Sequence, residues 1–201
     1  TPTADAGPDK NLNCSVTSAT IGTVAIVGNT YSWLPSTGLN NTTIAQPTAN
    51  PAVTTTYTVT VTGANGCTAT DVVTVNVNTT TPTADAGPDK NLNCSVTSAT
   101  IGTVAIVGNT YSWLPSTGLN NTTIAQPTAS PAVTTTYTVT VTGANGCTAT
   151  DVVIVNVNTT TPTADAGPDK NLDCSVTSTT IGTVAIVGNT YSWLPSTGLN
   201  N

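Results

Sequence analysis

Cysteine is the one reactive side chain that recurs at a fixed interval in this sequence. The five cysteines are Cys14, Cys67, Cys94, Cys147 and Cys174, and the first two pairs each span 53 positions. The chain has no histidine and no Cys-x-x-Cys motif, so zinc binding is disfavoured and disulfide formation is the chemistry that the pattern indicates. Paired cysteines in small domains are typical of an oxidising, extracellular compartment.

The spacing leaves two disulfide registers open. In the register that we favour, Cys14 pairs with Cys67 and Cys94 with Cys147, so each repeat closes on itself. Closing a loop of this length stabilises a fold by roughly 4 kcal/mol in the chain-entropy model. In the other register, Cys67 pairs with Cys94 and Cys147 with Cys174. That register would join neighbouring repeats and leave Cys14 alone.

The favoured register carries a geometric condition. Cys14 ends an early strand, whereas Cys67 begins the last strand of the repeat. Parallel neighbours would place these two positions at opposite ends of a sheet, so the first strand must be short or bent. The in-repeat counterpart of Cys174 would fall past Asn201, and we therefore expect the odd cysteine to result from where the sequence stops.

Side chains for acid–base catalysis are scarce. Three lysines are the only cationic side chains, and the nine acidic residues are all aspartates. We expect no enzyme and no cofactor, because no nucleophile, base and orienting group occur together. Asp5, Asp9 and Asp71 have the oxygen atoms that Ca²⁺ prefers, but their spacing favours turn capping, and we expect no metal site.

Charge also limits the partners. The net charge is −6, and no arginine accompanies the three lysines. Nucleic acids and anionic membrane surfaces are bound by basic clusters, so neither is expected as a partner. No apolar run approaches the roughly 20 residues of a membrane-spanning helix, and membrane insertion is not expected.

The element that organises the chain is a β-hairpin from Thr54 to Val77. Tyr57, Val59 and Val61 alternate with threonines, which predicts one face in a core and one face in water. Residues 63–66 read Gly-Ala-Asn-Gly, which favours a tight reversal. The same hairpin recurs 80 positions later.

The chain is a tandem repeat. Residues 81–160 copy residues 1–80 with two changes, Asn50 to Ser130 and Thr74 to Ile154. An 80-residue period fits one small β-domain. We therefore expect β-sandwich repeats at 1–80 (copy 1) and 81–160 (copy 2), and a third copy at 161–201 that contains only the first half of the unit.

The composition predicts an all-β fold. β-branched residues are abundant and strong helix formers are scarce, with Gly and Pro at short intervals. We expect about seven short strands in each copy, including a polar edge strand at Asn40–Gln46, arranged as a two-sheet sandwich. Trp33 should be the central core residue, with its indole N–H bound to a carbonyl.

Three motifs carry a resemblance to a known family. They are A-D-A-G-P-D-K near the start, Tyr31-Ser32-Trp33, and T-T-T-Y-T-V-T-V-T followed by G-A-N-G-C-T-A-T-D. Together they resemble the PKD/immunoglobulin-like tandem repeats of large secreted Bacteroidota surface proteins, including the gliding-adhesin type. The resemblance implies immunoglobulin-like β-sandwiches in a linear array and an extracellular, cell-surface stalk or adhesin. One departure is that Val72 follows Asp71, so the Asp-Ser/Thr acceptor of O-glycosylation in that phylum is absent here.

Asn-x-Ser/Thr sequons are dense, and a functional interpretation is that covalent glycans coat a fibre of low charge. We exclude Asn13 as a candidate because a disulfide at Cys14 would crowd it. The candidate glycosylation sites are Asn40, Asn41, Asn78, Asn120, Asn121 and Asn158.

Our functional prediction is a structural repeat of an extracellular filament or surface adhesin shaft, with copies of itself as partners. Near-identical domains present identical surfaces at fixed steps, and such surfaces favour open assemblies. The alternative is a glycan-binding adhesive module, which would need exposed aromatic side chains. The aromatics of each repeat are Tyr31, Trp33 and Tyr57, and their positions favour the core.

The third copy lacks a hairpin, so Leu172, Ile181 and Trp193 have no facing sheet. Such a half-sandwich should not hold together, because it leaves apolar surface and strand edges open. Either the sequence is a window of a longer repetitive chain, or another chain donates the missing strands. We expect the window.

Overall fold

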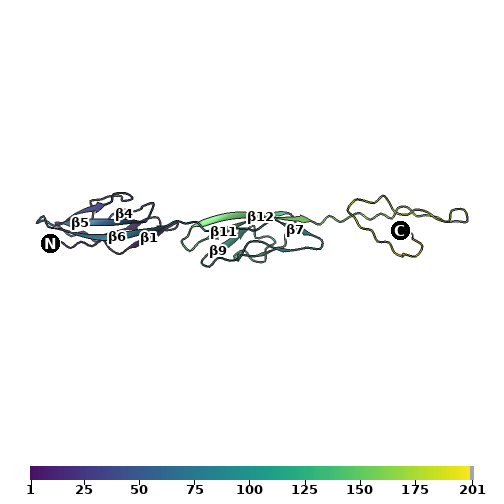
Figure 1. The fold of residues 1–201 in the computed structure, drawn as a ribbon, viewed down its shortest axis with the longest axis horizontal. Helices are drawn as coiled ribbons and strands as arrows, with labels where there is room; N and C mark the ends of the chain where they lie inside the picture. Colours follow the sequence, from purple (N-terminus) through teal and green to yellow (C-terminus); the bar gives the residue numbers. More distant parts are fainter. Residues whose placement is uncertain (200–201) are drawn as a thin grey trace. The chain divides into compact units, whose positions relative to one another are not determined.

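The computed structural model describes residues 1–199, and every regular element in that range is a β-strand (Figure 1). The strands of copy 1 are β1 (Lys10–Asn13), β2 (Ala19–Thr20), β3 (Thr30–Leu34), β4 (Thr48–Ala49), β5 (Thr55–Thr62) and β6 (Thr68–Asn78). Those of copy 2 are β7 (Lys90–Asn93), β8 (Ala99–Thr100), β9 (Thr110–Leu114), β10 (Thr128–Ala129), β11 (Thr135–Thr142) and β12 (Thr148–Asn158). The prediction of an all-β chain is confirmed.

Each copy contains one large and one small sheet. In copy 1 the large sheet has the order β1-β6-β5-β3, and β2 pairs with β4 in the small sheet. All of these pairings are antiparallel except that of β1 with β6, which is parallel. Copy 2 repeats this topology with β7-β12-β11-β9 and β10-β8. The parallel first strand decides where the cysteines lie.

The predicted hairpin is the pair β5 and β6, labelled in Figure 1. Side chains on successive strand residues point to opposite faces, and Tyr57, Val59 and Val61 are buried while the threonines between them are not. The turn is closed because the Gly63 N–H donates to the Cys67 carbonyl at 2.9 Å. Gly66 has a φ of 78°, which a residue without Cβ adopts at no steric cost.

The core forms between the two layers around Trp33. Its side chain is buried, and its indole N–H donates to the Ile44 carbonyl at 2.9 Å, as predicted. The Tyr57 hydroxyl donates to the Thr37 carbonyl at 2.7 Å. The cluster consists of Ala6, Leu12, Ile21, Trp33, Ala49, Tyr57, Val59, Val61, Val73 and Val75, and copy 2 has the equivalent cluster.

One predicted strand is wrong. Residues Asn40–Gln46 form bends without strand pairing, and the small sheet uses β4 instead, so each copy has six strands rather than about seven. The cause is local. The Asn40 Oδ1 accepts the Thr48 N–H at 2.8 Å, and the Asn41 Oδ1 accepts the Thr43 N–H at 2.8 Å. Asparagine side chains that bind nearby backbone compete with strand pairing.

Residues Thr1–Asn158 form one compact unit, and Thr159–Asn201 form another. The described part of the second unit, residues 159–199, has no strand, although its sequence nearly repeats that of residues 79–119. Trp113 is 1% exposed, whereas Trp193 is 38% exposed. Leu172 and Ile181 are also exposed, as expected for side chains without a facing hairpin. Residues 1–199 include no helix of the length and hydrophobicity needed to cross a membrane.

Candidate functional site: a disulfide junction between two copies

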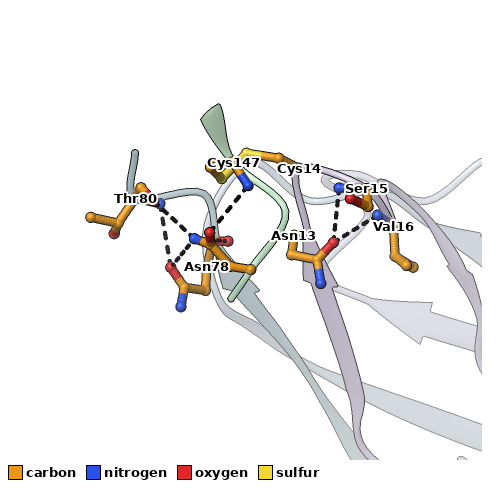
Figure 2. Close-up of a disulfide and its surroundings, with 8 residues drawn as sticks. Asn13, Cys14, Ser15, Val16, Asn78, Thr80 and Cys147 are labelled. Carbon is orange, nitrogen blue, oxygen red and sulfur yellow. Dashed lines mark hydrogen bonds between the residues drawn. A yellow bond between two sulfur atoms is a disulfide. The ribbon is translucent and has the colours of Figure 1, made fainter. Parts of the chain in front are cut away.

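The structure joins Cys14 of copy 1 to Cys147 of copy 2 in a disulfide (Figure 2). Their Cα atoms are 5.0 Å apart, within the range that the bond requires, and 133 positions separate them in sequence. Cys67 and Cys94 are free thiols, and so is Cys174. The predicted pairs Cys14–Cys67 and Cys94–Cys147 are therefore wrong, and so is the alternative Cys67–Cys94 register.

The parallel pairing of β1 with β6 explains why the in-repeat bond does not form. Asn13 lies opposite Asn78, so Cys14 lies at the end of β6. Cys67 comes directly before Thr68, at the start of that strand. A strand rises about 3.3 Å per residue, so roughly 33 Å separate the two ends of β6. Bonded cysteines have Cα atoms less than about 7 Å apart.

The same geometry excludes the alternative register. The chain leaves copy 1 through Asn78, at the end of β6, while Cys67 lies at the opposite end of that strand. A bond from copy 1 to copy 2 must start near the exit, where Cys14 lies. On the side of copy 2 it reaches Cys147, which follows the hairpin turn at Gly146 and directly precedes β12.

Hydrogen bonds from a single asparagine reinforce the disulfide. The Asn145 side-chain amide donates to the Thr80 carbonyl at 2.8 Å and to the Asn78 Oδ1 at 3.1 Å. A longer bond of 3.3 Å reaches the Asn78 carbonyl. The Asn145 Oδ1 also accepts the Cys147 N–H at 3.2 Å, so this residue connects the turn of copy 2 to the segment that leaves copy 1.

A second asparagine holds the loop that carries Cys14. The Asn13 Oδ1 accepts the Ser15 N–H at 2.9 Å and the Val16 N–H at 2.8 Å (Figure 2). This arrangement forms a tight Asx-type turn directly after β1. It presents Ser15 to Gly146 of copy 2, where a Cβ on the glycine would collide with the serine hydroxyl. We call the seven residues Cys14, Ser15, Asn78, Thr80, Asn145, Gly146 and Cys147 the junction.

The aspartates considered as calcium ligands cap backbone groups instead. The Asp71 Oδ2 accepts the Ala6 N–H at 2.8 Å, and the Asp5 Oδ1 accepts the Gly7 N–H at 2.9 Å. The Asp9 Oδ1 accepts the N–H of Thr74 at 2.8 Å. Among the residues that the structure describes, no group of three or more His, Cys, Asp or Glu is arranged to hold a metal ion.

All six candidate glycosylation sites lie at exposed positions: Asn40, Asn41, Asn78, Asn120, Asn121 and Asn158. Asn78 belongs to the junction, and its Oδ1 accepts the Thr80 N–H at 3.3 Å in addition to the amide of Asn145. Glycan attachment at these residues stays a prediction.

The junction residues other than the cysteines were not foreseen from the sequence. Asn145 and Gly146 are the turn residues that the repeated Gly-Ala-Asn-Gly motif predicts, whereas no sequence pattern indicates a role for Ser15. A usable signal was present, because Cys14 follows a strand near the exit of copy 1 while Cys147 marks the hairpin turn of copy 2. The parallel β1–β6 pairing is the arrangement named in the geometric condition on the Cys14–Cys67 register, and it separates those two cysteines.

No protein-family model matches the chain, and no curated protein does. Among solved structures, it is similar to extracellular domains 3–5 of Drosophila OTK, with a TM-score of 0.43 and 16% identity over 76% of this chain and 60% of that one. It thus spans less than two thirds of the OTK fragment. The PKD domain of the KIAA 1837 protein gives a TM-score of 0.34 and 28% identity over 40% of this chain and 91% of that one. Murine CEACAM1b gives a TM-score of 0.37 and 10% identity over 74% of this chain and 96% of that one.

The fold is defined by the chain's own strand order. A four-stranded sheet faces a two-stranded sheet across one core in each copy. The chain is therefore all-β and contains two immunoglobulin-like, PKD-like β-sandwich domains.

Proposed function

We propose that this chain is a structural repeat of an extracellular filament or surface adhesin shaft, either self-assembling or stalk-forming. The observation that carries the proposal is the disulfide from Cys14 to Cys147, because it ties one copy to the next rather than closing a single copy. Covalent coupling between near-identical domains is useful to a molecule that bears tension. The segment boundaries 1–80, 81–160 and 161–201 are part of this proposal.

The disulfide would limit extension under load. While it is intact, the 133-position segment that it closes cannot be stretched between the two cysteines. An extended chain spans about 3.5 Å per residue, so this segment would otherwise contribute on the order of 470 Å. In a shaft made in this way, the closed segment could extend only after the bond is reduced.

The disulfide also supports an extracellular location. Disulfides persist in oxidising compartments and are rare where thiols are kept reduced. The motifs shared with Bacteroidota surface repeats support a bacterial cell surface, with further copies of the repeat as the partners. Exposed sequon asparagines are compatible with covalent glycans on that surface.

The glycan-binding alternative is less well supported. A sugar-binding face needs exposed aromatic rings, but Trp33 and Tyr57 are buried in the core of copy 1. The Tyr31 hydroxyl accepts the Ile26 N–H at 2.8 Å, and its ring packs against the core. Binding of residues 1–160 to a defined sugar on a glycan array would favour this alternative.

The location and assembly can be tested by electron microscopy. Antibodies raised against residues 1–201 should label filaments or stalks on intact cells of the source organism. Labelling confined to the cell interior, or to material without an extended form, would contradict the proposal.

The mechanical role can be tested by pulling a single chain between handles at Thr1 and Asn201. We expect the extension at full unfolding to be shorter by roughly 470 Å without reductant than with it. Equal extensions in the two conditions would show that the bond does not carry load.

A further inference from the structure

Cys67 and Cys94 are the counterparts of the two bonded cysteines. Cys94 follows β7 as Cys14 follows β1, and Cys67 follows the hairpin turn of copy 1 as Cys147 follows that of copy 2. Cys94 therefore lies in copy 2 where the bonded Cys14 lies in copy 1, and Cys67 lies in copy 1 where the bonded Cys147 lies in copy 2.

The loop around Cys94 already has the bonded geometry. The Asn93 Oδ1 accepts the Ser95 N–H at 2.8 Å and the Val96 N–H at 2.9 Å, matching the turn that Asn13 forms beside Cys14. The Cys94 thiol is free, and the residue is exposed. The turn that would meet a hairpin turn of another copy is therefore already formed at this end of copy 2.

The turn around Cys67 is likewise preformed. The Asn65 Oδ1 accepts the Cys67 N–H at 3.1 Å, as in copy 2. A Cβ on Gly66 would meet nothing within 4 Å, whereas the same position at Gly146 is filled by Ser15. The open space at Gly66 therefore corresponds to the place that a serine from another copy occupies in the junction.

We propose that Cys67 and Cys94 are unfilled halves of the same junction and that a further copy of this repeat is the partner of each. Cys94 bonds the hairpin cysteine of a following copy, and Cys67 bonds the strand-end cysteine of a preceding copy. The inference rests on the proposed function, since it makes every junction of a shaft covalent.

The bonds interlock along such a chain. Cys94 lies within the loop closed by Cys14 and Cys147, so a bond from Cys94 to the next copy closes a second loop that overlaps the first. No complete copy could then be stretched by tension unless bonds on both sides of it were reduced. A chain of such copies has one disulfide for each junction and free thiols only at its two ends.

Forming each bond oxidises two thiols and needs an electron acceptor. The electron acceptor is the disulfide form of a thiol–disulfide oxidant, as expected in an oxidising compartment. The Cys94 thiolate attacks a sulfur of the oxidant's disulfide and displaces its other sulfur as a thiolate. The hairpin thiolate of the next copy then attacks the Cys94 sulfur in the mixed disulfide and releases the oxidant as a dithiol. Two protons and two electrons leave the two cysteines.

The test adds a complete copy, residues 81–160, before Thr1 of the full chain. Thiols are counted in unfolded, unreduced protein that was produced in an oxidising compartment. The original chain should show three free thiols, namely Cys67, Cys94 and Cys174. The extended chain contains two more cysteines and should still show three, because the added strand-end cysteine bonds Cys67 and the added hairpin cysteine takes its place as a free thiol.

The matched control is Cys67→Ser in the extended chain, which should show four thiols because the added strand-end cysteine loses its partner. Five thiols in the extended chain without this substitution would overturn the inference, since the new junction would be unbonded. One free thiol would also overturn it, because the in-repeat register and the Cys67–Cys94 register would each form three disulfides and leave one thiol. These counts do not depend on where the protein is located, so a failure of filament labelling would reject the proposed function and leave this result intact.

Discussion

The hairpin turns of copies 1 and 2 have the same sequence, Gly-Ala-Asn-Gly-Cys, at residues 63–67 and 143–147, but different surroundings. Cys147 is 1% exposed and bonded, whereas Cys67 is partly exposed and free. The Asn145 amide donates to the segment that leaves copy 1, whereas the hydrogen bond that Asn65 accepts from the Cys67 N–H stays within its own turn. The local sequence thus determines the shape of the turn, and the neighbouring copy determines its chemistry.

The two turns should differ most in how much stability the protein loses when their cysteines are replaced. Cys147→Ser removes a bond that closes a loop of 133 positions, which should reduce the free energy of unfolding by about 5 kcal/mol in the chain-entropy model. Cys67→Ser should change it by no more than about 0.5 kcal/mol, as for an ordinary surface substitution. Denaturant unfolding without reductant measures both values. Equal losses of stability for the two variants would contradict a disulfide at Cys147 and a free thiol at Cys67.

The glycines before these cysteines should show a smaller difference. Gly66 and Gly146 both have positive φ, so alanine should cost about 1–2 kcal/mol at either position through backbone strain. Gly146→Ala should cost about 1–3 kcal/mol more, because its Cβ collides with Ser15. Adding Ser15→Gly should remove that excess in a double-mutant cycle. If the excess persists without the serine side chain, the contact is not its cause.

Replacing the asparagines of the two turns, Asn65 and Asn145, should give a still smaller difference in stability. Asn65→Ala and Asn145→Ala each remove the side-chain oxygen that accepts the N–H of the following cysteine. Only Asn145→Ala also removes the amide that binds Asn78 and Thr80. Its additional loss should be about 1 kcal/mol, the usual net contribution of a hydrogen bond. Matching unfolding midpoints for the two variants would exclude a role for this amide in the junction.

The buried tyrosines of β5 and β11, Tyr57 and Tyr137, should show no difference between the copies. Burial raises the pKa of Tyr57 and of Tyr137, and a hydrogen bond from Thr55 or Thr135 acts in the opposite direction. The contribution of each buried, neutral tyrosine to the free energy of unfolding is therefore complete below the unfolded-state pKa of about 10. It is lost as the pH rises through the higher folded-state pKa. Tyr57→Phe and Tyr137→Phe should reduce this alkaline loss equally. Unequal pH profiles of unfolding would reveal a difference between the cores.

Features that depend on the local pattern were predictable from the sequence. Alternating Tyr, Val and Thr residues predicted the β5–β6 hairpin and its buried face, and the single Trp of each repeat predicted the centre of the core. The Asn40–Gln46 strand failed because asparagine side chains bind nearby backbone there, and composition does not indicate which of the two hydrogen-bonding patterns is adopted.

The disulfide register could not be derived from spacing, because it depends on a parallel strand pair and on a second copy. Cys14 and Cys67 are closer in sequence than Cys14 and Cys147, and a preference for self-closing domains favoured the shorter loop. The third copy shows the same dependence on distant residues. Trp193 occupies the position of Trp113 in the repeat and is exposed, because no hairpin accompanies it among residues 161–199.

Cleavage after lysine in unreduced protein tests the junction most directly. Cutting after Lys10, Lys90 and Lys170 yields a fragment 11–90 with Cys14 and Cys67, a fragment 91–170 with Cys94 and Cys147, and a fragment 171–201 with Cys174. Mass spectrometry should find 11–90 linked to 91–170 and 171–201 released alone. Separate fragments throughout would indicate bonds within each copy. All three fragments linked together would indicate the Cys67–Cys94 register, and either result would contradict a bond between Cys14 and Cys147.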